Sequence, residues 1–311
     1  SIFSLLYHYF IIVRITKPDV TISFLTRPNI LNSLIRYKNS KRILSERCYP
    51  SIAYKSNRLR YSIYKILLPL VYNLSDELFS NSIKINQDLR DNFGVRIPMT
   101  VIYNPVEPVG TRVSATNINR SDIIWIGRFI PIKNPGLLIQ AAKLCTTTPS
   151  LRFLGQGTLY HEIRSIVGNH PVYFEGVVKN VYEYILQSKI LALTSNSEGF
   201  PNVILESLAC NVPVIATNCL SGPLELLNEN DPVEIPQGSF FEAKYGILVN
   251  VGDVIGFSNA IDFLLSNPEK LKYYSIKGKE RSTHFQPLNI YNRLMQLIEN
   301  SDGQNPKLCV K

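Results

Sequence analysis

Hydrophobic and polar positions follow two alternating patterns along most of the chain. Short runs of Val, Ile, Leu and Phe predict β-strands, and longer stretches with an apolar residue every three or four positions predict helices. In the first third, we expect strands at 18–25, 42–46, 77–82 and 100–106, and helices at 29–36 and 60–72. Strands that alternate with helices are typical of a parallel sheet.

A polar stretch then separates this pattern from a second one. Residues 107–121 (EPVGTRVSATNINRS) combine Pro, Gly, Ser, Thr and Asn with little periodicity, which predicts a linker. We therefore expect an N-terminal domain at 1–106, a second domain at 122–285, and a C-terminal helix and tail at 286–311.

The second part repeats the alternation. Strands are expected at 122–128, 151–157, 172–176, 190–195, 212–217 and 245–249, and helices at 134–145, 253–266 and 288–300. Runs such as ILAL and VPVIA lack alternation, which suits strands covered on both faces. The predicted fold class is α/β, with two Rossmann-like, doubly wound parallel-sheet domains that face a cleft. Such sheets bind ligands at the carboxyl ends of their strands.

The opening segment SIFSLLYHYFIIVRI is apolar but is interrupted by His8 and Arg14. It is shorter than the roughly 18 apolar residues that span a bilayer, so we expect a buried helix. The five cysteines are dispersed without metal-site spacing, which favours reduced thiols in the cytoplasm and no structural zinc.

Charge is concentrated in the first domain. Of the net charge of +9, residues 1–110 carry +8, with fifteen Lys and Arg against seven Asp and Glu. Nine of these bases lie between Arg27 and Arg60, interleaved with tyrosines and opposed only by Glu46. Such a patch attracts phosphates on nucleic acid, anionic lipid or substrate. The alternative is a solvated helix face.

Two glutamates stand out in SNSEGFPNVILESLAC. Glu198 follows a predicted strand, and Gly199, Phe200, Pro201 and Asn202 lead into a helix. Backbone N–H groups at such a helix start suit a pyrophosphate. Glu206 lies one turn into the helix, and both carboxylates could line one pocket and accept sugar hydroxyls. The spacing alone leaves open that Glu206 is an ordinary helix residue and Glu198 a turn residue.

Two cations occupy the loop GRFIPIKNPG. Arg128 and Lys133 follow a strand that ends at Gly127, so they are expected to project into the same cleft. Two cations facing a helix N-terminus suit a diphosphate. The alternative is a pair of surface bases.

The order of the motifs resembles a known family. GRFIPIKNPGLLIQAAKL, FLGQGTLY, FEGVVKNVYEYI, SNSEGFPNVILESLACNVPVIAT and YGILVNVGD resemble glycosyltransferase family 4, retaining enzymes of the GT-B fold. PDVTISFL, SERCYPS, VIYNPV and CLSGPLELL resemble its branch that builds bacterial O-antigens and exopolysaccharides.

This resemblance implies roles for particular residues. Glu198 would contact the transferred sugar and Glu206 the nucleotide ribose, while Arg128 and Lys133 would bind the diphosphate. The main chain at Gly199–Asn202 would complete the phosphate cradle. Donor-binding residues also include Val177 and Val178, in the GVVKN loop that would read the base.

The resemblance also implies the partners. The donor would be a nucleotide-sugar, UDP-linked by analogy with this branch, and the acceptor a saccharide on a polyprenyl pyrophosphate. The basic surface would then rest on the inner leaflet of the cytoplasmic membrane, and nucleic acid would not be a partner. The chain lacks the Asp-x-Asp motif of metal-dependent transferases, so we expect no metal and no cofactor.

The chain departs from the family at two places. SERCYPS stands where many relatives have a His, so we place Glu46 and Arg47 on the acceptor side as local substitutes, and we place Arg27 on the same side. The family's first strand and Gly-rich loop are not found, which corresponds to about 60–80 residues of a Rossmann half. The chain would then be either a fragment of an active enzyme or a catalytically impaired, nucleotide-sugar-binding remnant.

Overall fold

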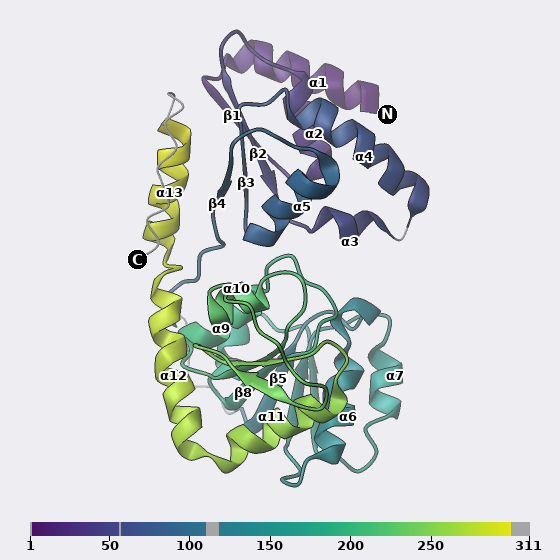
Figure 1. The fold of residues 1–311 in the computed structure, drawn as a ribbon, viewed down its shortest axis with the longest axis vertical. Coiled ribbons are helices and arrows are strands. Elements are labelled where there is room, and N and C mark those ends of the chain that lie inside the picture. Colours follow the sequence, from purple (N-terminus) through teal and green to yellow (C-terminus); the bar gives the residue numbers. More distant parts are fainter. Residues whose placement is uncertain (1, 56, 110–117, 300–311) are drawn as a thin grey trace.

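The computed structural model describes residues 2–55, 57–109 and 118–299, which form two α/β domains placed one above the other (Figure 1). The middle of the predicted linker, 110–117, and the predicted tail, 300–311, lie outside the described residues. None of the described helices is long and apolar enough to cross a bilayer.

The N-terminal domain contains a four-stranded parallel sheet in the order β1-β2-β3-β4. Its elements are α1 (Ile2–Thr16), β1 (Val20–Phe24), α2 (Thr26–Leu34), β2 (Lys41–Glu46), α3 (Pro50–Lys55), α4 (Arg58–Tyr72), β3 (Glu77–Ser80), α5 (Ile83–Phe93) and β4 (Met99–Val101). The strand order runs in one direction, so the described part of this domain is not doubly wound.

The C-terminal domain contains a seven-stranded sheet in the order β10-β11-β9-β8-β5-β6-β7, parallel except for β10. Its elements are β5 (Ser121–Ile126), η2 (Pro131–Lys133), α6 (Pro135–Leu144), β6 (Leu151–Leu154), α7 (Tyr160–Ser165), β7 (Val172–Gly176), α8 (Val181–Ile185), β8 (Ser188–Leu193), α9 (Asn202–Ala209), β9 (Val214–Thr217), α10 (Pro223–Asn228), β10 (Phe240–Glu242), β11 (Ile247–Val249), α11 (Val254–Ser266) and α12 (Pro268–Thr283).

Non-alternating apolar runs are buried on both faces, as the sequence predicts. Strand β8 divides the core, because Leu191 and Leu193 join one hydrophobic cluster while Ile190 and Ala192 join the other. Helices pack over both clusters, which completes a helix–sheet–helix sandwich. The sequence analysis did not identify β10, which is a three-residue strand, or α12.

The last helix returns to the first sheet. Helix α13 (Pro287–Glu299) runs beside the N-terminal domain in Figure 1. Its Ile290 and Leu297 join a cluster with Ile43 and Phe79 of the first sheet. The Lys41 ammonium also donates to the Leu297 carbonyl at 2.6 Å. The chain therefore crosses between the domains twice.

The prediction that the opening segment is a buried helix is wrong in one respect. Helix α1 forms, but Val13 is its only buried side chain among the described residues, and Ile12 and Ile15 are more than half exposed. The helix touches the rest of the domain through α2, where the Tyr9 hydroxyl donates to Asn32 Oδ1 at 2.8 Å. Apolar composition therefore predicted the helix but not its exposure.

Candidate active site between the two sheets

The strand order of the second sheet determines where a ligand can bind. Strand β5 pairs with β6 on one side and with β8 on the other, so the winding direction reverses between β5 and β8. Ligands of such sheets bind beyond the carboxyl ends of the strands at this reversal. The loops that leave β5 and β8 carry Arg128, Lys133 and Glu198, so the fold brings these three residues to one edge.

Lys133 and Glu198 form an ion pair at the centre of this edge. The ammonium lies 2.6 and 2.7 Å from the two carboxylate oxygens, and the Glu198 side chain is only 8% exposed. Ser195 donates to the same carboxylate at 2.6 Å. The carboxylate is therefore held in one orientation and carries a neutralising partner.

Buried polar contacts fix the lysine loop from beneath. Thr194, at the end of β8, donates to the Lys133 carbonyl at 3.0 Å and accepts from the Trp125 indole N–H at 2.9 Å. Trp125 lies in the core, and it also links β5 to the site. Asn134 adopts a left-handed conformation (φ 45°) that joins η2 to α6. The backbone can therefore hold Lys133 over the end of β8.

Arg128 lies on the same loop but is free to move. Its side chain is exposed and makes no hydrogen bond or ion pair with any described residue. The main chain around it is held tightly, because a Cβ on Gly155 would lie 1.9 Å from the Gly127 carbonyl oxygen. The Phe129 N–H also donates to the Gln156 carbonyl at 2.9 Å. The glycine turn after β6 thus supports the arginine loop, a role that sequence reasoning missed.

The start of α9 provides unpaired donors beside this cluster. In the part of the chain that the structure describes, the N–H groups of Gly199, Phe200 and Asn202 have no protein acceptor. Pro201 precedes the helix and has no N–H to offer. Free N–H groups at a helix N-terminus attract anions. This geometry fits the predicted phosphate cradle.

Glu206 lies in the fifth position of α9. Its carboxylate is half-buried and has no hydrogen-bond or ion-pair partner among the described residues. Burial raises the pKa of this carboxyl. A desolvated carboxylate without a partner is costly, which favours the interpretation that a bound ligand supplies its hydrogen bonds.

The loop after β8 also contacts the N-terminal domain. A Cβ on Gly199 would lie 2.7 Å from the Arg47 carbonyl oxygen, so only glycine fits there. The Phe200 ring stacks on Tyr103 with centroids 5.5 Å apart. Asn202 accepts from the Asn104 amide at 2.7 Å. The carboxyl ends of strands in both sheets therefore meet here. Because the Phe200 ring packs on Tyr103, only the backbone of Phe200 is available to a ligand.

The three predicted acceptor-side residues lie in different environments. Arg27 is exposed in the first turn of α2 and has no partner in the described regions. The Arg47 guanidinium is held by Ser45 and Asn104, each at 2.8 Å, and covers the rings of Phe24 and Phe79. Arg47 thus links the β2 loop to the segment that leads into the second domain.

Glu46 is fully buried beneath the loop that carries Arg47. Its carboxylate accepts from Thr26 at 3.1 Å, from Tyr72 at 3.0 Å and from the Arg47 N–H at 3.2 Å. Burial raises the pKa of Glu46, against the opposing effect of these hydrogen bonds. In this conformation the Glu46 side chain is too deeply buried to contact a ligand. Its hydrogen bonds instead support the loop that carries Arg47.

Val177 and Val178 follow β7 at the same edge of the second sheet. Val177 is 73% exposed, whereas Val178 packs partly against the core cluster around β8. Gly176 has a positive φ of 70°, which turns the chain out of the strand. The segment therefore presents its main chain and Val177 to solvent, at the far side of β6 from Lys133.

Glu225 joins the domains in a way that sequence reasoning did not assign. This carboxylate from α10 accepts from the Ser82 hydroxyl at 2.7 Å, the Ile83 N–H at 3.1 Å and the Tyr103 hydroxyl at 2.7 Å. Ser82 and Ile83 begin α5, so the charge lies at a helix N-terminus of the opposite domain. Burial and the neighbouring carboxylate raise the pKa of Tyr103. The CLSGPLELL motif contained Glu225, but no spacing pointed to its partner.

We expect Glu225→Ala to lower the free energy of unfolding by about 2–4 kcal/mol, because it leaves the buried Ser82 hydroxyl and the partly buried Ile83 N–H and Tyr103 hydroxyl without this acceptor. Thermal and denaturant unfolding of the variant measure this. Glu234→Gln, at an exposed glutamate of the same domain, is the matched control. Equal stability of Glu225→Ala and the control would show that the domains do not depend on this contact.

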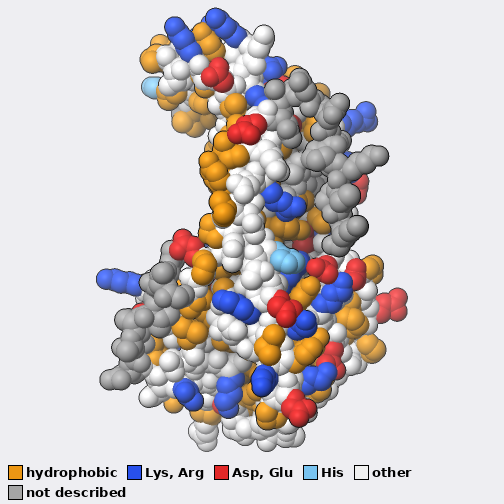
Figure 2. Space-filling model, turned by 90° about the vertical axis from the view of Figure 1, so that its left-hand side faces the viewer, with side chains coloured by type: hydrophobic (Ala, Val, Ile, Leu, Met, Phe, Trp, Pro, Cys, Tyr) orange, Lys and Arg blue, Asp and Glu red, His pale blue; other side chains and the backbone are white. Residues whose placement is uncertain are grey.

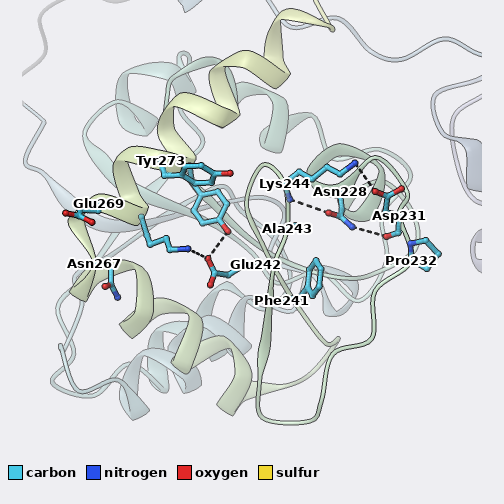
Figure 3. Close-up of a pocket in the computed structure, with 12 residues that line it drawn as sticks. Asn228, Asp231, Pro232, Phe241, Glu242, Ala243, Lys244, Asn267, Glu269 and Tyr273 are labelled. Atoms are coloured by element: carbon cyan, nitrogen blue, oxygen red, sulfur yellow. Dashed lines mark hydrogen bonds and ion pairs between the residues drawn. The ribbon is translucent and has the colours of Figure 1, made fainter. Parts of the chain in front are cut away.

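Two hollows in the surface lie away from the Lys133–Glu198 pair. One of about 790 Å³ lies between β10, the end of α10 and the start of α12 (Figure 3). Figure 3 shows Lys244 turned toward Asp231, with which it pairs at 2.8 Å, whereas Glu269 points away from this pair. Because β10 is antiparallel to β11, Glu242 lies at the amino-terminal edge of the sheet, opposite the site. A smaller hollow of about 260 Å³ lies beneath Arg47, beside α13.

The described residues contain no group of three or more His, Cys, Asp or Glu side chains placed to hold a metal ion. The charges at the site are instead the Lys133–Glu198 pair, Arg128 and Glu206. Figure 2 shows basic and acidic side chains interspersed over the larger domain. At the β5–β8 edge, the Arg128 side chain and the unpaired N–H groups at the start of α9 lie close to the Lys133–Glu198 pair.

Comparison with known proteins agrees with this geometry. A family model described as Glycosyl transferases group 1 matches residues 111–281. The N-acetylgalactosamine-N,N'-diacetylbacillosaminyl-diphospho-undecaprenol 4-alpha-N-acetylgalactosaminyltransferase of Campylobacter jejuni is 29% identical over 283 residues, 88% of this chain and 74% of that protein. A second transferase of that organism, which extends a GalNAc-containing glycan on diphospho-undecaprenol, is 26% identical over 91% of this chain and 75% of its own length.

A solved structure shows the same architecture. Anabaena HepE in complex with UDP superposes with a TM-score of 0.78 at 17% identity, over 95% of this chain and 82% of HepE. At this identity the likeness supports the fold alone. The family match, which covers more than half of the chain, confirms the resemblance inferred from the motifs, and the superposition confirms the predicted fold class. The chain belongs to the group 1 glycosyl transferases and has their GT-B fold.

Proposed function

We propose that this chain is a retaining transferase that moves a hexose or N-acetylhexosamine from a UDP-sugar to a lipid-linked or saccharide acceptor in bacterial surface polysaccharide synthesis. The observation that carries the proposal is the Lys133–Glu198 pair, with Arg128 and the start of α9 beside it, at the reversal point of the second sheet. That edge gathers positive charge for a diphosphate and a carboxylate for sugar hydroxyls.

The proposed roles follow from charge and position. In transfer, the bond between the sugar carbon and the diphosphate oxygen breaks, and a bond to the acceptor oxygen forms on the same face of the sugar. Negative charge grows on the leaving diphosphate, where Arg128, Lys133 and the N–H groups at Gly199–Asn202 stabilise it. The acceptor proton passes to the departing diphosphate. Glu198 orients the sugar, Glu206 accepts from the ribose, and Val177 and Val178 lie beside the base.

The acceptor is proposed from the relatives and the charge distribution. The two Campylobacter jejuni relatives are named for acceptors on diphospho-undecaprenol. Residues 1–110 of this chain carry a net charge of +8. A polyprenyl pyrophosphate held at the inner face of the cytoplasmic membrane would satisfy that charge. Arg27 is the exposed base at the carboxyl edge of the first sheet, while Glu46 and Arg47 fix the loop next to it.

Titration calorimetry with UDP, followed by UDP- and GDP-sugars, tests this function. We expect UDP to bind with a Kd of about 1–100 μM, in the range usual for such substrates, and EDTA to leave it unchanged. UDP-sugar binding without transfer to any lipid-linked acceptor would instead support the alternative, a nucleotide-sugar-binding remnant. Absence of UDP and GDP binding would contradict both interpretations.

We expect Glu206→Gln to weaken UDP binding and to remove the preference for UDP over 2′-deoxy-UDP, because a carboxylate accepts both ribose hydroxyls better than an amide does. The same change should stabilise the free protein near neutral pH. Burial raises the pKa of the Glu206 carboxyl in the folded protein above its value in the unfolded chain. The protonated carboxyl therefore contributes stability at pH values below the pKa of the unfolded chain, and this contribution is lost as the pH rises through the pKa of the folded protein. Calorimetry and unfolding against pH check the two effects; weaker UDP binding with the ribose preference retained would contradict the assignment.

A further inference from the structure

Helix α4 (Arg58–Tyr72) has two apolar faces, and only one of them packs against the described part of the protein. Leu68, Val71 and Tyr72 are buried in the core of the N-terminal domain. The outer face carries a row of large apolar side chains that are 50–73% exposed: Leu59, Ile63, Ile66 and Leu70. At about 100° per residue, these four positions fall within about 60° of each other on the helix. We call them the α4 stripe.

Basic residues flank the α4 stripe on both sides. Arg58 and Lys65 lie on one side and Arg60 on the other, each about 90–130° from the centre of the stripe, and all three are exposed. Arg60 lies over the rings of Tyr54 and Tyr64, which holds its charge at the border. No acidic residue occurs between Arg47 and Ser75. The charged side chains of α4 itself are therefore all basic.

This combination selects one kind of partner. A continuous exposed apolar row marks an interaction surface. A second copy of this helix is a poor partner, because two-fold pairing would place one cationic border against another. An interfacial helix that inserts apolar side chains between lipid chains and keeps Lys and Arg at the head groups has this arrangement. With 15 residues, α4 would lie along a bilayer surface.

We propose that the α4 stripe docks the N-terminal domain on an anionic lipid bilayer, with Arg58, Arg60 and Lys65 at the lipid phosphates. The inference deepens the proposed function, on which it rests for a lipid-linked acceptor. Figure 1 places α4 on the side of the N-terminal domain away from α13. The helix begins eleven residues after Arg47, whose carbonyl lies against Gly199 of the candidate site. A short segment of the chain therefore connects the helix that would rest on the bilayer to the place where the two domains meet.

Co-sedimentation of the full chain with vesicles tests this docking. We expect binding to vesicles of equal parts phosphatidylcholine and phosphatidylglycerol, and weak binding to phosphatidylcholine alone. Ile63→Asn/Ile66→Asn and Arg58→Gln/Lys65→Gln should each reduce the partition coefficient at least about tenfold. Salt should weaken binding of the wild type more than that of the charge variant. The control Ile255→Asn/Ile276→Asn changes two exposed isoleucines of the other domain and should bind as the wild type does.

UDP titration of each variant separates this inference from the proposed function. Retained UDP binding shows that the site and fold are intact, so a loss of vesicle binding then supports docking through α4. Failure of the wild type to bind anionic vesicles, with UDP binding intact, would overturn the inference and leave the proposed function standing. Unchanged vesicle binding by the α4 stripe variant would also overturn it. A shift of that variant from dimer to monomer in sedimentation, without a change in vesicle binding, would assign the face to a second copy instead.

Discussion

The Glu198→Gln variant is expected to transfer sugar about 100- to 1,000-fold more slowly while binding UDP at least as tightly as the wild type. Its carboxylate is nearly buried and is oriented by Lys133 and Ser195. The amide keeps the shape but presents a donor to the Lys133 ammonium and no charge to the transferred sugar. UDP lacks that sugar, and removal of a carboxylate beside the diphosphate relieves repulsion. The rate and the UDP affinity should therefore change independently.

Single-turnover transfer and UDP calorimetry on the same preparation measure the two effects. Ser195→Ala is the graded companion, because it removes one 2.6 Å hydrogen bond to Glu198 but keeps the carboxylate. We expect it to lose about tenfold in rate, which corresponds to about 1.4 kcal/mol. Transfer by Glu198→Gln within twofold of the wild-type rate would show that Glu198 acts only as the partner of Lys133.

Local patterns predicted most of the strands because many of the apolar runs are fully buried. Leu151–Leu154, for example, is buried at every position, so periodicity and composition were sufficient. The loops at the candidate site were also predictable, because Gly127 lies at the end of one predicted strand and Glu198 lies three residues beyond another. The β5–β8 pairing then brings Lys133 to Glu198, and that pairing required the strand order rather than the sequence.

Contacts between the domains could not be predicted from local sequence. The partners of Glu225 are more than a hundred positions away, and no spacing rule connects α10 to the start of α5. The exposure of α1 escaped prediction for a related reason. An apolar helix is expected to be buried, but whether another element covers it depends on the sheet edge beside which it lies. Glu46 was placed on the acceptor side because SERCYPS stands where many relatives have a His, whereas side-chain packing turns Glu46 into the core.

Arg128→Met and Lys133→Met are expected to weaken UDP binding similarly, by about 10- to 100-fold, but to differ in stability. Arg128 is exposed without a partner among the described residues, so its loss should change the free energy of unfolding by less than about 0.5 kcal/mol. Loss of Lys133 leaves the nearly buried Glu198 carboxylate with Ser195 as its remaining side-chain partner. We expect that to lower stability by about 1–3 kcal/mol, less than for a fully buried pair, because Lys133 is 24% exposed.

The double variant Lys133→Met/Glu198→Gln separates the two roles of the lysine. Removing both charges should recover much of the lost stability, because no unpaired charge remains in the interior. It should not recover UDP affinity, because the diphosphate still lacks its cation. Calorimetry with UDP, UMP and uridine locates the effect: the losses should be large for UDP, smaller for UMP and absent for uridine. An equal loss for all three ligands would mean that the substitutions disturb the whole site, and Arg128 and Lys133 would then not be diphosphate ligands.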